Sequence, residues 1–271
     1  MTRSFFSMSP EGPSLGYVQS GQGPVATFQH GLGADAAQPR EVFPDDVGHS
    51  LLTLECRGHA QSELGPPEEV SIPTFVDDLA RLLDRLALPR CVIGGISLGA
   101  AVALRFAVVH PECVAALILA RPAWVTASAP ANLAIFQEIA GLLTEHGAQE
   151  GKARFQQSQS LAAIGSISPD NAVSLLGQFD APGPLTRAIL LHRISNGGPA
   201  VSEEELSALR IPVLVLGNEM DAIHPVAYAK TLATIIPAAR LIEITPKSLS
   251  RARYVADFRA AVAGFMMERA Q

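Results

Sequence analysis

The sequence predicts an α/β fold, namely a doubly wound, mostly parallel sheet with a helical lid insertion. Short apolar runs typical of buried strands alternate with longer patterns of helical periodicity, as in βαβ units. The residues best suited to chemistry directly follow strand-like runs, where ligands bind in such sheets. One long stretch, residues 122–208, has helical patterns and no β-rich run. This stretch indicates an insertion into the core.

Composition favours one large domain with an insertion. The chain has 271 residues, of which 48% are hydrophobic and 17% charged, so it can bury an extensive core. Its formal net charge of −6 disfavours nucleic acid and anionic membranes as partners. No apolar run approaches the roughly 18 residues of a membrane span, and the first residues lack the apolar region of a signal peptide.

The cysteine pattern predicts a cytoplasmic protein with reduced thiols. Cys56, Cys91 and Cys113 do not have the C-x-x-C spacing of metal or redox sites. We expect no metal, no cofactor and a small-molecule substrate as the partner. The sequence leaves the oligomeric state open, a homo-oligomer included.

The first part of the chain predicts three strands. Residues 14–20 alternate loosely in hydropathy, which favours an antiparallel strand, and a glycine-rich turn follows at 21–24. Residues 25–29 and 51–54 are apolar, partly β-branched runs, as expected for strands that are buried on both faces.

A helix, a strand and a second helix are expected next. Ser71 can cap a helix that has Pro73 in its first turn, and apolar residues then recur at helical spacing up to Leu86. Residues 91–93 predict another buried strand, and residues 100–109 predict a helix rich in good helix formers.

The motif Gly95-x-Ser97-x-Gly99 joins that strand to that helix and is typical of a nucleophile elbow. The serine of such an elbow is held in a strained turn, and only small neighbours let the strand and the helix approach closely. The backbone N–H of Leu98 would point at a substrate from a helix N-terminus, where partial positive charge favours an oxyanion. The alternative is a glycine-rich turn with an incidental serine, in a chain that has 22 glycines.

The rest of the chain predicts a strand at 114–120, the lid and a return to the sheet. The remaining elements, in order, are helices at 133–143 and 185–194, a strand at 211–216, a helix at 226–236, a strand at 240–244 and a helix at 255–268. We therefore divide the chain into a core of residues 1–121 and 209–271 and a lid of residues 122–208.

These residues resemble the α/β-hydrolase superfamily over the whole length of the chain. His30-Gly31-Leu32-Gly33 is similar to the family's oxyanion loop. Residues 55–60, Glu-Cys-Arg-Gly-His-Ala, resemble the Asp-x-Arg-Gly-His-Gly turn of its lidded members. Asp221 follows a buried strand and comes after Ser97 in the chain, and in the family the nucleophile likewise precedes the acid.

The resemblance implies a serine-hydrolase site. Ser97 would be the nucleophile and Asp221 the acid of a triad. The backbone N–H groups of Leu32 and Leu98 would form the oxyanion hole.

The third triad member, a histidine in the loop after the last strand, is missing. The family pattern places it near position 249 after a glycine, and this chain has Ser248 and Leu249 there. All seven histidines lie at or before His224, so a shifted alignment cannot supply one. A proficient serine hydrolase would need a substitute, because losing that histidine costs about a millionfold in kcat.

His224 is the candidate substitute. It lies three residues after Asp221, in the loop beyond the strand that carries the acid, and Pro225 restricts the backbone there. An imidazole at that place could reach Ser97 directly or through one water, with a pKa suited to proton transfer near neutrality. The alternatives are a histidine that only lines the pocket and a site without a triad-like base.

Three further residues are expected to bind substrate, namely His30, Gly31 and His192. Arg57 and His59 are expected to tie their turn by hydrogen bonds behind the site. Lys247 is expected to cover the surface.

The pattern as a whole favours a hydrolase of a small or medium carboxylic ester or lactone that acts through Ser97 with an incomplete or rewired triad. A second hypothesis is a lyase, a decarboxylase or a rearrangement in the same pocket, where the oxyanion N–H groups would stabilise an enolate. A third is a catalytically inactive relative that binds a ligand. An engineered loss of the histidine is a fourth, although Ser248 departs from the pattern as well.

Overall fold

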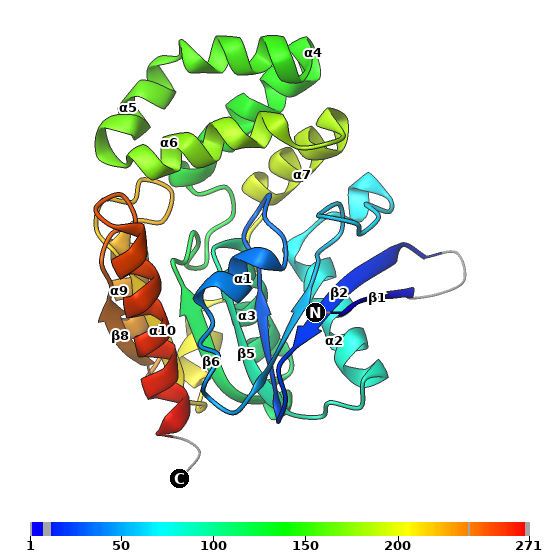
Figure 1. Ribbon diagram of the computed structural model, residues 1–271, viewed down its shortest axis with the longest axis vertical. Coiled ribbons are helices and arrows are strands. Elements are labelled where there is room, and N and C mark those ends of the chain that lie inside the picture. Colours follow the sequence, from blue (N-terminus) through cyan, green and yellow to red (C-terminus); the bar gives the residue numbers. More distant parts are fainter. Residues whose placement is uncertain (1, 8–11, 238, 269–271) are drawn as a thin grey trace.

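The computed structural model describes residues 2–7, 12–237 and 239–268, which form the predicted α/β architecture (Figure 1). The strands are β1 (Thr2–Ser7), β2 (Ser14–Ser20), β3 (Val25–Gln29), β4 (Ser50–Leu54), β5 (Cys91–Ile96), β6 (Val114–Ala120), β7 (Val213–Gly217) and β8 (Ala239–Glu243). They form one sheet in the order β1-β2-β4-β3-β5-β6-β7-β8. β3 to β8 run parallel, whereas β2 runs antiparallel to both β1 and β4. The prediction of a mostly parallel sheet is confirmed.

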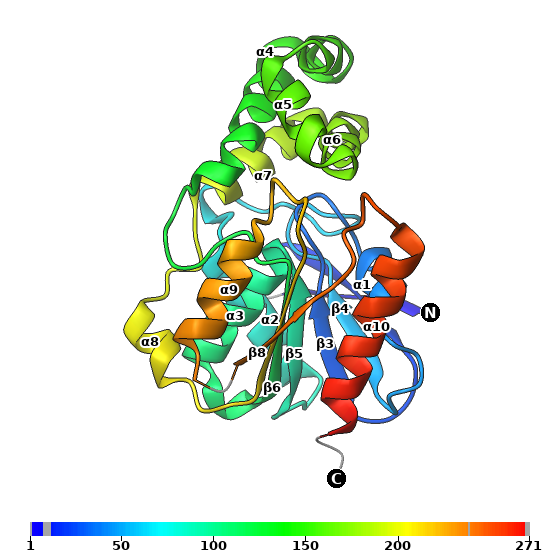
Figure 2. The same cartoon turned by 90° about the vertical axis from the view of Figure 1, so that its left-hand side faces the viewer.

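Helices cover both faces of this sheet. They are α1 (Ala37–Val42), α2 (Ile72–Arg85), α3 (Leu98–Val109), α9 (Val226–Ile235) and α10 (Arg251–Met267). Figure 2 shows α1 and α10 on one side of the sheet and α2, α3 and α9 on the other. β5 contributes to both layers because its side chains alternate: Ile93 packs in the cluster with α2 and α3, and Val92 packs in the cluster with α10.

The chain between β6 and β7 consists mainly of helices. It contains α4 (Ala134–Gln156), α5 (Gln159–Ile167), α6 (Pro169–Leu176), α7 (Pro184–Asn196) and α8 (Glu203–Ala208). Figures 1 and 2 show α4 to α7 gathered beyond one end of the sheet, and we call these four helices the cap. α8 lies beside α9 instead (Figure 2), because Leu206 is buried in the core cluster that also includes α9. The predicted lid, residues 122–208, therefore extends past the cap at its C-terminal end.

Several elements differ from the predictions. β1 and α1 were not expected, since each has only six residues and too few turns or alternations to show a clear periodicity. α4 continues well beyond the predicted 133–143 and kinks at Gly147, where φ is 72°. Among the described residues, no helix has both the length and the apolar character that crossing a membrane requires.

Candidate active site

Ser97 lies between β5 and α3 in the strained conformation of a nucleophile elbow. Its φ of 56° and ψ of −111° are rare for a residue with a side chain. The two flanking glycines explain why the turn is possible. A Cβ on Gly95 would lie 2.3 Å from the carbonyl oxygen of Gly99, and a Cβ on Gly99 would lie 2.2 Å from that of Gln29. Only glycine fits at either position, so the local sequence dictates how the serine is presented.

Two buried histidines hold the loop that follows β3. His30 uses both ring nitrogens: Nδ1 lies 2.9 Å from the Gly31 carbonyl, and Nε2 accepts a hydrogen bond from the Cys56 N–H at 3.0 Å. His59 accepts a hydrogen bond from the Gly33 N–H at 3.0 Å, also through Nε2. Burial lowers the pKa of both imidazoles. Both are therefore neutral structural groups, which agrees with the role predicted for His59 and leaves His30 no ring nitrogen for a substrate.

The loop itself approaches Ser97. Gly31 and Leu32 line the same cavity as Ser97, and the Gly31 N–H donates to Oε1 of Gln38 at 2.7 Å. Within the described loops and caps, neither the Leu32 N–H nor the Leu98 N–H takes part in a backbone hydrogen bond. Leu98 is the first residue of α3, and an N–H there has no partner inside the helix. Both groups are therefore free to donate to a ligand.

The cavity has a volume of about 80 Å³ and lies between the core and the cap. Core loops contribute Leu32, Ser97, Arg121, His224 and Lys247. The cap contributes Phe136, Asp170, Asn171, Ser174 and Leu175, and the turn between α6 and α7 contributes Gln178. The core residues follow β3, β5, β6, β7 and β8. The cavity thus lies at the carboxyl ends of the parallel strands, where ligands bind in such sheets.

Asp221 and His224 form a hydrogen-bonded pair in one turn after β7. Oδ1 of Asp221 lies 2.9 Å from Nδ1 of His224 and accepts the backbone N–H of the same residue at 3.1 Å. Oδ2 of Asp221 faces Arg121, with Nε at 2.8 Å and Nη2 at 2.6 Å. All three side chains are at least nine-tenths buried. The carboxylate is therefore used on both oxygens, by the imidazole on one and the guanidinium on the other.

This pairing determines which nitrogen of His224 is available. Burial alone would raise the pKa of Asp221, but Arg121 and His224 hold it well below its usual range, so the carboxylate is ionised. Burial lowers the pKa of His224, and Arg121 adds to this effect while Asp221 opposes it. An ionised carboxylate only accepts hydrogen bonds, so Nδ1 carries the proton and Nε2 keeps a free lone pair. This is the tautomer that a general base needs.

Ser97 Oγ has no direct hydrogen bond to any side chain within the described parts of the chain. It shares the cavity with His224, and one water can bridge a serine and a base over a short gap. The structure thus brings Ser97, Gly31, Leu32 and His224 to one cavity, with Asp221 directly behind the imidazole.

The structure does not bring His192 to this cavity. His192 is exposed on α7 and lies in a separate groove between α4 and α7. The inward face of α7 is formed by Arg187, Ala188, Leu190, Leu191, Ile194 and Ser195. Apolar residues occur nearly all around this helix, so its periodicity did not show which side faces the core.

Two cations of the site were missed by the sequence analysis. Lys247 was expected at the surface, yet it lines the cavity, because its loop begins at the carboxyl end of β8, on the same edge of the parallel sheet as the other loops of the site. Arg121 directly follows β6, and so it lies at a strand end, where ligands bind in such sheets.

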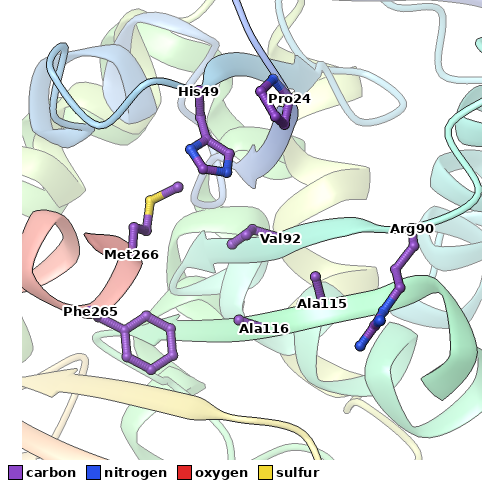
Figure 3. Close-up of a pocket in the computed structure, with 8 residues that line it drawn as sticks. All are labelled: Pro24, His49, Arg90, Val92, Ala115, Ala116, Phe265 and Met266. Carbon is purple, nitrogen blue, oxygen red and sulfur yellow. The ribbon is translucent and has the colours of Figure 1, made fainter. Parts of the chain in front are cut away.

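A larger cavity lies at the opposite ends of the same strands. It has about 450 Å³ and is drawn in Figure 3 with Pro24, His49, Arg90, Val92, Ala115, Ala116, Phe265 and Met266 around it. Its lining comes from the amino ends of β3, β4, β5 and β6 and from the end of α10. No pair of these side chains forms a nucleophile and a base, so the smaller cavity at Ser97 is the candidate active site.

Residues 27–246 match the family model of the alpha/beta hydrolase fold. One relative, assigned as the carbamate hydrolase RutD of Pseudomonas savastanoi pv. phaseolicola, is 27% identical over 233 residues, which cover 83% of this chain and 86% of that protein. The pimeloyl-[acyl-carrier protein] methyl ester esterase of Aeromonas hydrophila is 25% identical over 248 residues, which cover 87% of this chain and 92% of that one.

Solved structures share the fold over nearly the whole chain. A thermophilic esterase from Thermogutta terrifontis has a TM-score of 0.76 at 20% identity and full coverage of both chains. The enol-lactonase of Burkholderia xenovorans LB400 has a TM-score of 0.73 at 19% identity, with 95% of this chain and 98% of that chain covered. At such identities the likeness concerns the fold alone.

Proposed function

The chain belongs to the alpha/beta hydrolase fold family, and on that premise we propose that it hydrolyses small or medium carboxylic esters or lactones through an acyl-enzyme on Ser97. The placement of His224 carries the proposal. Its Nδ1 is bonded to Asp221, and the same imidazole lines the cavity that contains Ser97. In the proposed triad, Asp221 orients His224, and His224 activates Ser97.

The proposed reaction begins with attack of Ser97 Oγ on the carbonyl carbon. Nε2 of His224 takes the hydroxyl proton, directly or through one water, and Asp221 stabilises the imidazolium that forms. The N–H groups of Leu32 and Leu98 donate to the oxyanion. When the intermediate collapses, the carbon–oxygen bond of the alcohol breaks and the alkoxide leaves with the proton from His224.

The second half of the reaction releases the acid. A water attacks the acyl-enzyme carbonyl, and His224 accepts its proton. Collapse of this intermediate breaks the bond to Ser97 Oγ, which takes the proton back from His224. The carboxylic acid product leaves and the site returns to its starting state.

The cap is proposed to act as a lid in this cycle. Pockets for drug-sized ligands have about 300–1,000 Å³, whereas the cavity at Ser97 has about 80 Å³. A medium-sized ester therefore enters only if α6 and its neighbours move away from the core, and their return excludes water from the oxyanion.

The named activities of the relatives support an acyl substrate. The Aeromonas protein is a methyl ester esterase, and the Pseudomonas protein is assigned to carbamate hydrolysis. Both reactions cleave a carbonyl from a heteroatom, which is the bond that the proposed nucleophile and oxyanion hole would act on.

The test is turnover of p-nitrophenyl esters of increasing acyl length, together with mass spectrometry of the protein after brief mixing. We expect the wild type to turn over short esters and to gain the acyl mass on the peptide that contains Ser97. Ser97→Ala and His224→Ala should each lose at least about 1,000-fold in kcat. His146→Ala is the matched control, because His146 lies on α4 away from the cavity. Equal turnover by the wild type and Ser97→Ala would contradict the proposal.

A further inference from the structure

Two cations at the candidate site have no acidic partner. Lys247 lines the cavity, and within the described chain its ammonium takes part in no hydrogen bond or ion pair. Arg187 of α7 is only 9% exposed, and among the residues that the structure describes its guanidinium forms one hydrogen bond, to the neutral Oε1 of Gln178 at 3.4 Å. Its Nε is buried without a partner. Gln178 itself lines the cavity, so both cations belong to its surroundings.

Unpaired cations at such a place are unusual for this chain. Burying a charge without a counter-charge is costly, and proteins normally pair such groups. The other buried guanidiniums follow the rule, since Arg57 is paired with Asp78 and Arg121 with Asp221. The chain as a whole carries a net charge of −6, so acidic residues are not in short supply.

The nearby carboxylates are engaged elsewhere. Asp221 is used by Arg121 and His224, and Glu41 pairs with Arg251 at 2.7 Å. Asp170 also lines the cavity, and it accepts a hydrogen bond from the Ser168 hydroxyl at 2.9 Å. It acts on Lys247 only at longer range and forms no ion pair with it.

We infer that the substrate itself supplies the missing charge: it carries a carboxylate that pairs with Lys247 while its ester or lactone carbonyl lies at Ser97. This inference rests on the proposed function, because it names the class of substrate for the same site. Both residues line one small cavity, so a short spacer joins the two ends of such a substrate. Arg187 lies behind Gln178 on the cap side of the cavity, and its charge adds to the positive electrostatic potential there.

A single carboxylate fits this site better than a phosphate. Lys247 offers one unpaired ammonium, and the cavity is small, whereas a phosphate dianion needs several donors around it. Burial and the neighbouring Arg121 lower the pKa of Lys247. A bound carboxylate favours the charged ammonium and so opposes both effects.

The experiment measures binding without turnover, by calorimetry on Ser97→Ala protein. The probes are monomethyl esters of dicarboxylates from malonate to adipate, each compared with the neutral methyl ester of the monocarboxylate of the same backbone length. We expect at least one charged probe to bind more tightly than its neutral counterpart. Adding Lys247→Met should weaken that probe about 10- to 100-fold and leave the neutral one unchanged, since one charge-assisted hydrogen bond is lost. Lys247→Arg should keep most of the affinity.

The control is Arg253→Met in the same Ser97→Ala background. It removes the same charge from an exposed position in the first turn of α10, and it should leave both affinities unchanged. The inference is overturned if no charged probe is preferred, or if Lys247→Met weakens charged and neutral probes alike. A lower melting temperature with unchanged affinities would also overturn it, because Lys247 would then only hold the cap near Asp170. Failure of the wild type to hydrolyse any ester would refute the proposed function and leave the binding result standing.

Discussion

Replacing Arg121 by methionine tests the electrostatics of the site. Arg121 donates one hydrogen bond to Asp221 at 2.8 Å and forms a second ion-pair contact at 2.6 Å, and both side chains are almost fully buried, with 8% and 2% exposure. Methionine fills much of the same volume but leaves Oδ2 of an ionised, buried carboxylate without a donor. Removing one partner of a buried pair costs about 3–5 kcal/mol. We expect the free energy of unfolding to fall by that amount.

The assay is urea unfolding followed by circular dichroism, with the slope m checked for constancy. Lys152→Met is the matched control. It breaks a pair of similar length, 2.6 Å to Asp180, whose side chains are 30% and 63% exposed. Such an exposed pair contributes within about 1 kcal/mol. The reasoning is refuted if the two variants lose the same small amount of stability.

The same variant predicts a change in the pH profile. Arg121 lowers the pKa of His224, so removing its charge raises that pKa. The base then stays protonated to higher pH, so the rising limb of the plot of kcat/KM against pH should shift to higher pH. In the wild type that limb should lie below the ordinary histidine value of about 6.5. Arg121→Lys keeps the charge and should move the limb less. An unchanged limb in Arg121→Met would show that His224 is not the titrating base.

Further predictions concern the elbow, acid stability and the thiols. Gly99→Ala should lose most activity and stability, because its Cβ would clash with the backbone of Gln29. Gly141 in α4 has open space around it, so Gly141→Ala should stabilise the protein by no more than about 1 kcal/mol. Thermal melting compares the two variants. Burial lowers the pKa of His30 and His59 in the folded state. Their contribution to stability is therefore complete above about pH 6.5 and lost as pH falls below it, so the urea midpoint should drop from pH 7 to pH 5 and should not rise. Iodoacetamide should label only Cys113 in the native protein, because the other two cysteines are buried, and mass spectrometry would show any second adduct.

The parts of the site that the sequence could predict are those dictated by nearby residues. The elbow at Ser97 depends on contacts between Gly95 and Gly99, which one short motif contains. His224 lies in the loop after the strand that carries Asp221, and this position was enough to name it as the candidate base; the hydrogen bond between the two spans only three residues. Short apolar runs likewise predicted most strands, and apolar residues at helical spacing between them predicted several of the helices.

The missed features depend on contacts between distant parts of the chain. Arg121 and Asp221 are 100 residues apart in sequence and meet only because β6 and β7 are neighbours in the sheet. Lys247 lines the cavity together with residues of α6, which come about 75 residues earlier in the chain, and no local pattern signals that the two segments share a cavity. The side of α7 that carries His192 is likewise decided by packing against α4.

In the proposed mechanism, the turn after β7 combines two tasks that α/β hydrolases usually give to separate loops. The proposed acid and base lie at the two ends of one four-residue turn, Asp221 to His224. The hydrogen bonds within this turn do not involve the last loop of the core. In that mechanism the segment from 245 to 250 has no catalytic role, so its residues can change with the ligand, as the proposed role of Lys247 illustrates. Transplanting Asp-x-x-His into the equivalent turn of a histidine-deleted relative would ask whether such a module is portable between members of the fold.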